Sequence, residues 1–189
     1  MEEIILKDKE LFLYLNNLGS QPFDAFWELV SERFVWIPLY VILCYLLYKN
    51  FSLKAFIFIL IFVALGTTVS DQVASIFKHG FLRFRPCKDP ELQGLFRKVV
   101  TPGSDYGFYS AHASNTFFLA TYLSILLKGK LKWFPIAIFV WAAIVSYSRI
   151  YLAVHFPGDV LMGAFMGIII GLIFSFLAKK VIAKQTDQN

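Results

Sequence analysis

The sequence predicts an all-α protein, a polytopic membrane helical bundle with about five transmembrane helices preceded by amphipathic interfacial helices. Of its 189 residues, 58% are hydrophobic and only 16% are charged, below the roughly 25% charged residues of soluble domains. Five long apolar stretches are separated by polar segments, of which one, residues 78–109, is long. A soluble domain of this length could not bury so much apolar surface, so the composition indicates a membrane protein.

The amino-terminal segment, residues 1–33, differs from the rest of the chain. Apolar and charged positions alternate along residues 4–32, and Gln21-Pro22 interrupts the pattern. This pattern predicts two short amphipathic helices that lie at the membrane surface. A re-entrant or poorly formed first span is the alternative interpretation of the same residues.

Residues 34–182 form one predicted transmembrane domain. A membrane span needs about 20 residues, so the shorter apolar stretches are expected to include flanking residues. The only long polar segment, residues 78–109, contains several prolines and glycines and is expected to be a loop with turns. The five apolar stretches are Phe34–Tyr48, Leu53–Phe77, Ser110–Leu127, Trp133–Tyr147 and Pro157–Val181.

Lysines in the short connecting segments predict the orientation in the membrane. With five spans, residues 49–54, residues 128–132 and the tail, residues 183–189, lie on one side together with Lys179 and Lys180, and Asp187 is the only acid there. Such lysine clusters mark the cytoplasmic side of a cell inner (plasma) membrane. The amino terminus and the long loop then face the periplasm or cell exterior. This distribution of the +5 net charge argues against a nucleic-acid partner.

The first polar cluster comes where the second apolar stretch ends. Lys78 and Arg85-Pro86 are separated by six residues, with Arg83 between them. These cations could converge on one anion, although basic side chains also reach routinely from a membrane edge into water.

The second cluster, Ser110-Ala111-His112, stands where the third apolar stretch begins. The free N–H groups and the dipole of a helix start favour a phosphate, and the Ser110 hydroxyl could add a donor. An ordinary N-cap serine beside a histidine at the headgroups is the alternative.

The third cluster is Ser148-Arg149 followed by His155 and Asp159. His155 and Asp159 are four positions apart, so the two would share a face if this turn is helical. The carboxylate could then accept a proton from one imidazole nitrogen and leave the other nitrogen free to attack.

Together the three clusters place ionisable groups at consecutive span ends, where such groups are costly and mark function. Lys78, Arg85 and Arg149 could neutralise a phosphate group and the charge of its transition state. Neither a carboxylate set suited to magnesium nor a Cys/His set suited to zinc is apparent, and Cys44 and Cys87 suggest no disulfide. We therefore expect a metal-independent enzyme without a cofactor.

The pattern Lys-x6-Arg-Pro, Ser-x-His and Ser-Arg-x5-His-x3-Asp, over residues 78–159, resembles the type 2 phosphatidic acid phosphatase superfamily and its membrane branch. The resemblance implies that His155 attacks phosphorus to form a phosphohistidine and that Asp159 orients it. His112 would protonate the leaving oxygen and then activate water. Phosphate binding would fall to Lys78, Arg85, Ser110, Arg149 and the N–H of Ala111.

The second block departs from the Pro-Ser-Gly-His of the family, because Tyr109 and Ala111 replace the proline and the glycine. The alanine is harmless if its position is helical, but it would be restricted at positive φ. Asp71 lies about two helical turns before Lys78 and could tune it or serve a structural role.

A site at the outer membrane edge suits a lipid substrate that stays in the bilayer. The family resemblance offers undecaprenyl pyrophosphate, phosphatidylglycerol phosphate, phosphatidate and lipid A phosphate, and the polar residues do not distinguish these. Three alternatives use the same cations. They are a lipid phosphotransferase, a vanadate-dependent haloperoxidase, against which the apolar spans count, and a non-catalytic protein that binds or transports lipid headgroups.

Overall fold

The computed structural model describes residues 2–100 and 104–186, and in these ranges the chain is helical without a β-strand beyond one isolated bridge. The predicted all-α bundle is therefore confirmed. The helices are α1 (Glu2–Asn17), α2 (Asp24–Ser31), α3 (Ile37–Asn50), α4 (Leu53–Phe81), α5 (Ala111–Leu126), α6 (Phe134–Tyr151) and α7 (Pro157–Thr186).

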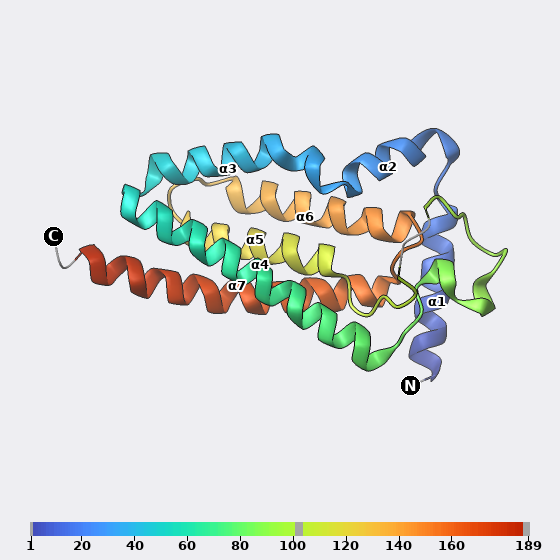
Figure 1. Ribbon diagram of the computed structural model, residues 1–189. Helices are drawn as coiled ribbons and strands as arrows, with labels where there is room; N and C mark the ends of the chain where they lie inside the picture. Colours follow the sequence, from blue (N-terminus) through green and yellow to red (C-terminus); the bar gives the residue numbers. More distant parts are fainter. Residues whose placement is uncertain (1, 101–103, 187–189) are drawn as a thin grey trace.

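Helices α3 to α7 run along one long axis, and α1 lies across one end of them (Figure 1). The loop between α4 and α5 gathers at the same end as α1, whereas the C terminus lies at the opposite end. Helices α5 and α7 both begin at the end covered by α1. The positive ends of two helix dipoles therefore point toward this end, called the loop end below.

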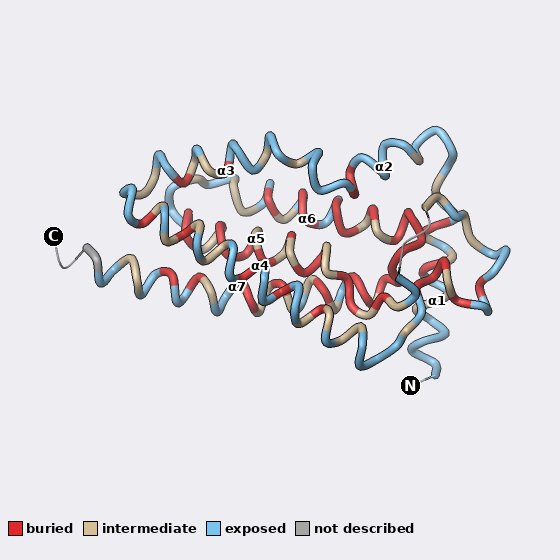
Figure 2. Tube along the Cα trace, in the orientation of Figure 1, coloured by how far each residue is buried: buried red, intermediate tan, exposed pale blue. Residues whose placement is uncertain are grey.

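Helix α5 is the central helix of the bundle, and buried residues mark nearly its whole length in Figure 2. Its buried side chains include Phe118 and Tyr122, which pack into the main apolar core with Ile59 of α4 and Trp141 of α6. A helix that is apolar on all sides is stable only when neighbours surround it. The outer helices instead keep many apolar side chains on the surface, as expected for contact with lipid.

Glycines spaced by four residues bring α7 against α5. Gly163, Gly167 and Gly171 share one face of α7, and a methyl group at Gly167 would overlap the carbonyl oxygen of Ser114. Small residues at this spacing let two helix backbones approach closely. This contact is the most extensive between any two helices and fixes the start of α5 relative to the start of α7.

Within the described residues, α4, α6 and α7 are each long and apolar enough to cross a membrane. A fourth span is possible if α2 and α3, with the turn Arg33–Trp36 between them, count as one span bent by 66°. Helix α5 has 16 residues, fewer than the roughly 20 that a membrane span needs, and lies in the centre of the bundle. The bundle thus contains the five expected apolar helices, although fewer qualify as spans by length and composition.

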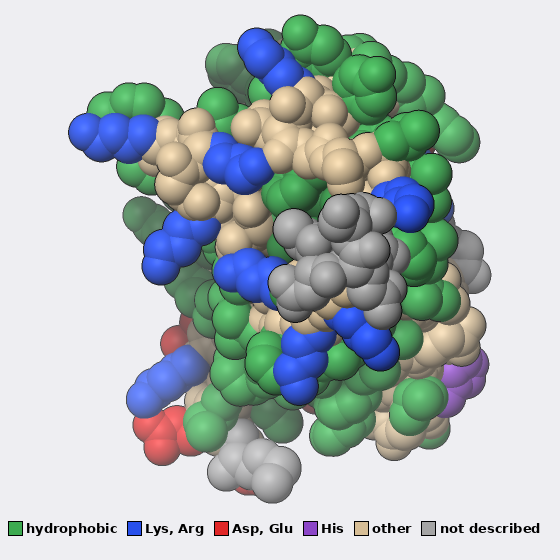
Figure 3. All heavy atoms as spheres, turned by 90° about the vertical axis from the view of Figure 1, so that its left-hand side faces the viewer, with side chains coloured by type: hydrophobic (Ala, Val, Ile, Leu, Met, Phe, Trp, Pro, Cys, Tyr) green, Lys and Arg blue, Asp and Glu red, His purple; other side chains and the backbone are tan. Residues whose placement is uncertain are grey.

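The ends of the predicted segments differ slightly from the structure. Helix α4 continues to Phe81, so Lys78 lies on its last turn rather than in the loop. Helix α7 reaches Thr186, so only residues 187–189 of the predicted tail lie outside the described residues. Seen from the end that carries the C terminus, the charged side chains are mainly Lys and Arg (Figure 3).

Candidate active site

A cavity of about 910 Å³ runs from the loop end into the apolar part of the bundle. Its polar part is lined by Lys78, Arg85, Ala111, His112, Arg149 and His155, all of which the sequence singled out. Its apolar part lies among α3, α4, α5 and α6, where Leu43, Leu60 and Trp141 belong to the lining. The cavity therefore joins an anion site to a compartment that fits apolar chains.

His155 lies between α6 and α7 and is 2% exposed. The guanidinium of Arg85 donates a hydrogen bond from Nη1 to His155 Nε2, at 3.2 Å. Arginine can only donate, so Nε2 must be the acceptor and the proton of a neutral ring is on Nδ1. Nε2 therefore carries the lone pair of the neutral ring, and a phosphate that takes over the hydrogen bond of Arg85 would leave it able to attack.

The pKa of His155 is lowered well below its ordinary value. Burial disfavours the charged ring, and the neighbouring cations Arg85, Arg149 and Lys78 disfavour it further. The ring therefore stays neutral through ordinary pH, as a nucleophile requires.

Asp159 is fully buried on the other side of the ring, with Oδ2 3.6 Å from His155 Nδ1. The predicted shared helical face differs from the structure, because α7 begins only at Pro157 and His155 precedes it. Asp159 nevertheless faces the imidazole, since Oδ2 also accepts a hydrogen bond from the N–H of Phe156 at 2.9 Å. Phe156 is thus the residue before the first helical position, and Asp159 is the third helical residue. A side chain at the third position that accepts from the N–H of the cap residue is one half of a capping box.

The second cluster forms the start of α5. Ser110 is the N-cap residue, fully buried, and its hydroxyl accepts a hydrogen bond from the N–H of Ala113. Ala111 is the first helical residue and has no positive φ, so its side chain brings no backbone strain. The ring of His112 makes no hydrogen bond within the described part of the chain.

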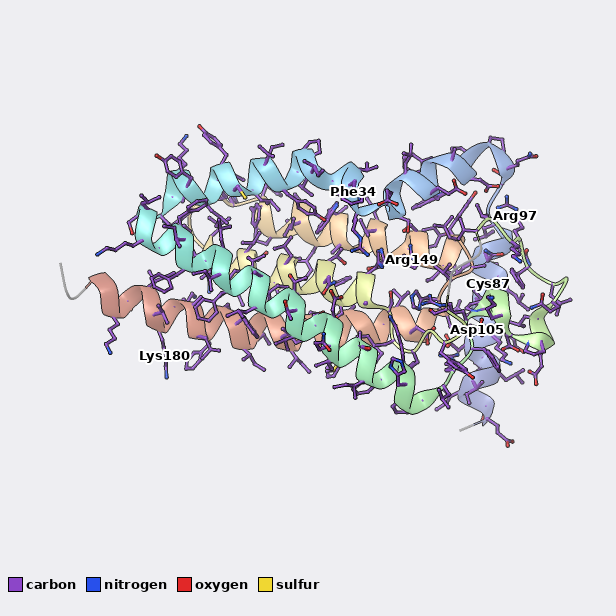
Figure 4. The ribbon with its side chains drawn as sticks, in the orientation of Figure 1. Phe34, Cys87, Arg97, Asp105, Arg149 and Lys180 are labelled. Atoms are coloured by element: carbon purple, nitrogen blue, oxygen red, sulfur yellow. The ribbon has the colours of Figure 1, made fainter. Side chains whose placement is uncertain are left out.

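The cations are held by different partners. Arg85 donates from Nε to the carbonyl of Ser104 and from Nη2 to its hydroxyl, both at 3.0 Å, and from Nη1 to the carbonyl of Val154. Arg149 extends from α6 toward the junction of α2 and α3, near Phe34 (Figure 4), and donates to the hydroxyl of Ser31. Among the described residues, the buried Nε of Arg149 has no hydrogen-bond partner, which suits a side chain whose role is to bind an anion in the cavity that it lines.

Sequence reasoning missed the supporting side chains Asp8, Ser31 and Ser104. Asp8 of α1 accepts hydrogen bonds from Arg83 and from the N–H of Gly158. Ser31 belongs to the segment that was expected to lie on the membrane surface, and Ser104 to the long loop. Their distances along the chain from their partners left no local signal by which to find them.

Asp71 and Tyr109, which the sequence left without a firm role, are each held by a neighbouring side chain in the structure. Asp71 lines the cavity and accepts a hydrogen bond from the amide of Asn115, at 2.8 Å. Tyr109 is fully buried and packs edge-on against Phe77 of α4, with ring centroids 5.3 Å apart. Apolar packing thus fixes the junction before α5, where the family pattern has a proline.

A second cavity of about 440 Å³ adjoins the first. Both cavities are lined by Ser31, Arg33, His112 and Arg149, so these side chains lie between the two spaces. The second cavity adds the carboxylates of Glu28 and Glu32 from α2 and its end. His112 can thus reach groups in either cavity.

The sequence of residues 56–182 matches the family described as the PAP2 superfamily. This chain belongs to the PAP2 superfamily. The predicted resemblance is confirmed, and with it the class of membrane phosphatase. Within residues 2–100 and 104–186, no three His, Cys, Asp or Glu side chains gather as a metal site would require.

Known proteins are similar to this chain over most of its length. The lipid A 4'-phosphatase of Bacteroides thetaiotaomicron is 34% identical over 184 residues, which are 95% of this chain and 81% of the relative. The crystal structure of Aquifex aeolicus LpxE has a TM-score of 0.63 at 26% identity and covers 87% of this chain and 92% of its own. The crystal structure of the first transmembrane PAP2-type phosphatidylglycerolphosphate phosphatase from Bacillus subtilis shares the fold, with a TM-score of 0.75 at 20% identity. The match covers 96% of this chain and 89% of that chain.

Proposed function

We propose that this protein hydrolyses a phosphate monoester on a membrane lipid through a phosphohistidine at His155, on the extracytoplasmic face. The phosphorylated sugar headgroup of lipid A is the first candidate substrate. The observation that carries the proposal is the single cavity that joins both histidines and the three cations to an apolar compartment. The lipid A 4'-phosphatase activity of the relative from Bacteroides thetaiotaomicron supports the choice of lipid.

In the first step, the lone pair of His155 Nε2 attacks phosphorus while the bond from phosphorus to the leaving oxygen breaks. The negative charge of the bound phosphate offsets the cations around His112 and lets its ring carry a proton, which it donates to that oxygen, so the leaving group departs as an alcohol. Lys78, Arg85 and Arg149 stabilise the charge on the other phosphate oxygens. The first N–H groups of α5, at Ala111 and His112, point to the same anion.

In the second step, the now neutral His112 takes a proton from a water molecule, whose oxygen attacks phosphorus. The bond from phosphorus to Nε2 breaks, and the lone pair returns to His155. Inorganic phosphate leaves, and both histidines regain their starting protonation states. Asp159 supports the positive charge that develops on the imidazole of His155 during the first step.

The polar lining of the second cavity supports the proposal that the leaving group carries hydroxyl groups. A leaving group protonated by His112 must lie beside this residue, and the second cavity extends from it. Glu28 and Glu32 could accept hydrogen bonds from sugar hydroxyls, and Arg33 and Arg149 of the same cavity could donate to them. This mixed set of acceptors and donors suits the hydroxyl-rich headgroup of a phosphorylated sugar.

We also propose that the loop end faces the periplasm or cell exterior of an inner membrane and that residues 1–33 lie at its outer surface. The lysines at the opposite end, among them Lys49, Lys128 and Lys180, support this orientation. A protease-sensitive tag at the amino terminus should be cleaved in spheroplasts or intact cells. Protection of the tag in intact spheroplasts, with cleavage only after lysis, would contradict the orientation.

Phosphate release from a panel of lipids tests the activity. Purified protein in detergent with EDTA would receive lipid A, undecaprenyl pyrophosphate, phosphatidate and phosphatidylglycerol phosphate. We expect release with lipid A fastest, unchanged by EDTA, and absent in His155→Ala. No release from any lipid would favour a headgroup-binding protein, and release that requires an added alcohol acceptor would indicate a phosphotransferase.

Removing one carboxylate of the second cavity tests the leaving-group site. Glu32→Gln should raise KM for lipid A about three- to tenfold, because one charged acceptor of a sugar hydroxyl is lost. KM for phosphatidate should stay unchanged. Glu10→Gln, the same change on an exposed position of α1, is the matched control. Equal KM changes for both lipids would contradict a sugar site beside His112.

A further inference from the structure

We infer that Asp8 of α1 is a positioning residue for the nucleophile, an inference that rests on the proposed role of His155. The carboxylate of Asp8 is linked to the imidazole by two routes. One route passes through Arg83 and Asp159, and the other through the backbone at the start of α7. Helix α1 would then be part of the catalytic apparatus as well as an amphipathic surface helix.

The first route is a chain of charged hydrogen bonds. Arg83 donates from Nη2 to Asp8 Oδ2 at 2.6 Å and from Nη1 to Asp159 Oδ1 at 2.7 Å. The guanidinium also lies over the ring of Phe156, 4.3 Å from its centroid. Asp8 thus fixes the guanidinium that holds one oxygen of Asp159, while the other oxygen of Asp159 faces His155.

The second route is a close backbone contact. The N–H of Gly158 donates to Asp8 Oδ1 at 2.8 Å. A Cβ atom at Gly158 would lie 2.7 Å from Asp8 Oδ2, so this position suits a glycine. A carboxylate at a helix N-terminus satisfies a free N–H and is favoured by the dipole. Asp8 therefore holds the first turn of α7, which carries Asp159.

The negative charge of Asp8 affects the position of Asp159 beside the nucleophile. Arg83 is shared between the carboxylates of Asp8 and Asp159. With Asp8 neutral, the guanidinium would interact with Asp159 alone and would draw its carboxylate toward Arg83. The distance of 3.6 Å between Asp159 Oδ2 and His155 Nδ1 would then increase, so the carboxylate could not close on Nδ1 during attack and Nε2 would be misaligned. Misplacement by about 1 Å can cost about a hundredfold in rate.

Other contacts hold α1 on the bundle without Asp8. Lys9 pairs with Asp89 at 2.8 Å and with Glu91 at 2.6 Å. The amide of Asn16 donates to the carbonyl of Tyr151 at 2.7 Å. Phe12 is fully buried and packs edge-on against Phe156. An isosteric change at Asp8 should therefore leave α1 docked, which separates positioning from folding.

The test compares Asp8→Asn with two controls on the same helix. Glu10→Gln removes an exposed charge, and Lys9→Met weakens docking without touching Asp8. We expect Asp8→Asn to lower kcat about tenfold to a hundredfold, with KM within twofold of wild type and an unchanged Tm. The burst of phosphoenzyme should slow by the same factor. Both controls should keep kcat within about twofold.

Three outcomes would overturn the inference. Wild-type kcat in Asp8→Asn would show that the carboxylate positions nothing. A parallel fall in kcat and Tm in Asp8→Asn and Lys9→Met would reduce Asp8 to a docking contact. A rise in KM alone would move its role to substrate binding. The proposed function fails separately, if wild type releases no phosphate or if His155→Ala remains active.

Discussion

Helices α5 and α7 begin at the same end of the bundle, yet their N-termini are used in opposite ways. Carboxylates occupy the start of α7, where Asp159 accepts from the N–H of Phe156 and Asp8 from that of Gly158. Among the described residues, no carboxylate accepts from the start of α5, where Ala111 and His112 line the cavity. One positive helix end is thus neutralised by the protein, and the other is left for an anion.

The two histidines of the site differ in the same way, because the protein surrounds one of them and leaves the other open. His155 is buried, with Arg85 at one ring nitrogen and Asp159 beside the other. His112 lies between two cavities and its ring has no hydrogen-bond partner within the described residues. The protein fixes the orientation of the proposed nucleophile, whereas the substrate would complete the surroundings of the proposed acid. The following predictions test this contrast, from the largest expected effect to the smallest.

His155→Ala should reduce phosphate release by about a thousandfold or more, because no other group can form the phosphoenzyme. Phosphate release from lipid A with EDTA measures the loss. Gel filtration and circular dichroism should show a folded bundle, since the alanine removes only one buried ring. Activity near wild type in a folded variant would contradict the assignment of the nucleophile.

His112→Gln should lower kcat about a hundredfold to ten-thousandfold for a lipid phosphate, whose alkoxide leaving group needs a proton. An aryl phosphate with an acidic phenol should lose much less, because its leaving oxygen departs unprotonated. Comparing kcat for both substrates in wild type and variant measures this dependence. An equal loss with both would indicate that His112 has another role.

Gly167→Ala should destabilise the contact that sets α5 relative to α7. The added methyl group would overlap the carbonyl of Ser114, and overpacking of this kind costs about 1–3 kcal/mol. We expect Tm to fall by several degrees in detergent and kcat to fall with it. Gly80→Ala in α4 is the control, since its methyl group would meet nothing within 4 Å. Equal Tm values for the two variants would contradict close packing at Gly167.

Ala111→Gly should change phosphate release by less than about twofold. The position is already helical and keeps its backbone N–H with either residue, so the glycine of the family pattern adds no conformation that the site needs. Kinetics with lipid A measure the effect. An increase well above twofold would show that the methyl group of Ala111 obstructs the phosphate.

Much of the candidate site could be predicted because each block of residues is local in sequence. Lys78 and Arg85, Ser110 to His112, and Arg149 to Asp159 each lie at the end of an apolar helix. Apolar helices that cross the same bilayer place their ends near its surfaces, so these blocks can meet without long-range information. The local geometry was less predictable, since His155 precedes α7 and Asp159 reaches it through a cap rather than a shared helical face.

The sequence by itself determined a membrane bundle, its phosphatase family and the two histidines that face one cavity. Apolar length and motif spacing are properties of neighbouring residues and can be read along the chain. Only the tertiary structure decided that Asp8 meets Gly158 across 150 residues and that Ser31 and Ser104 hold two of the cations. These polar pairs depend on how α1, α2 and the loop pack over the bundle, and no periodicity in the sequence encodes that packing.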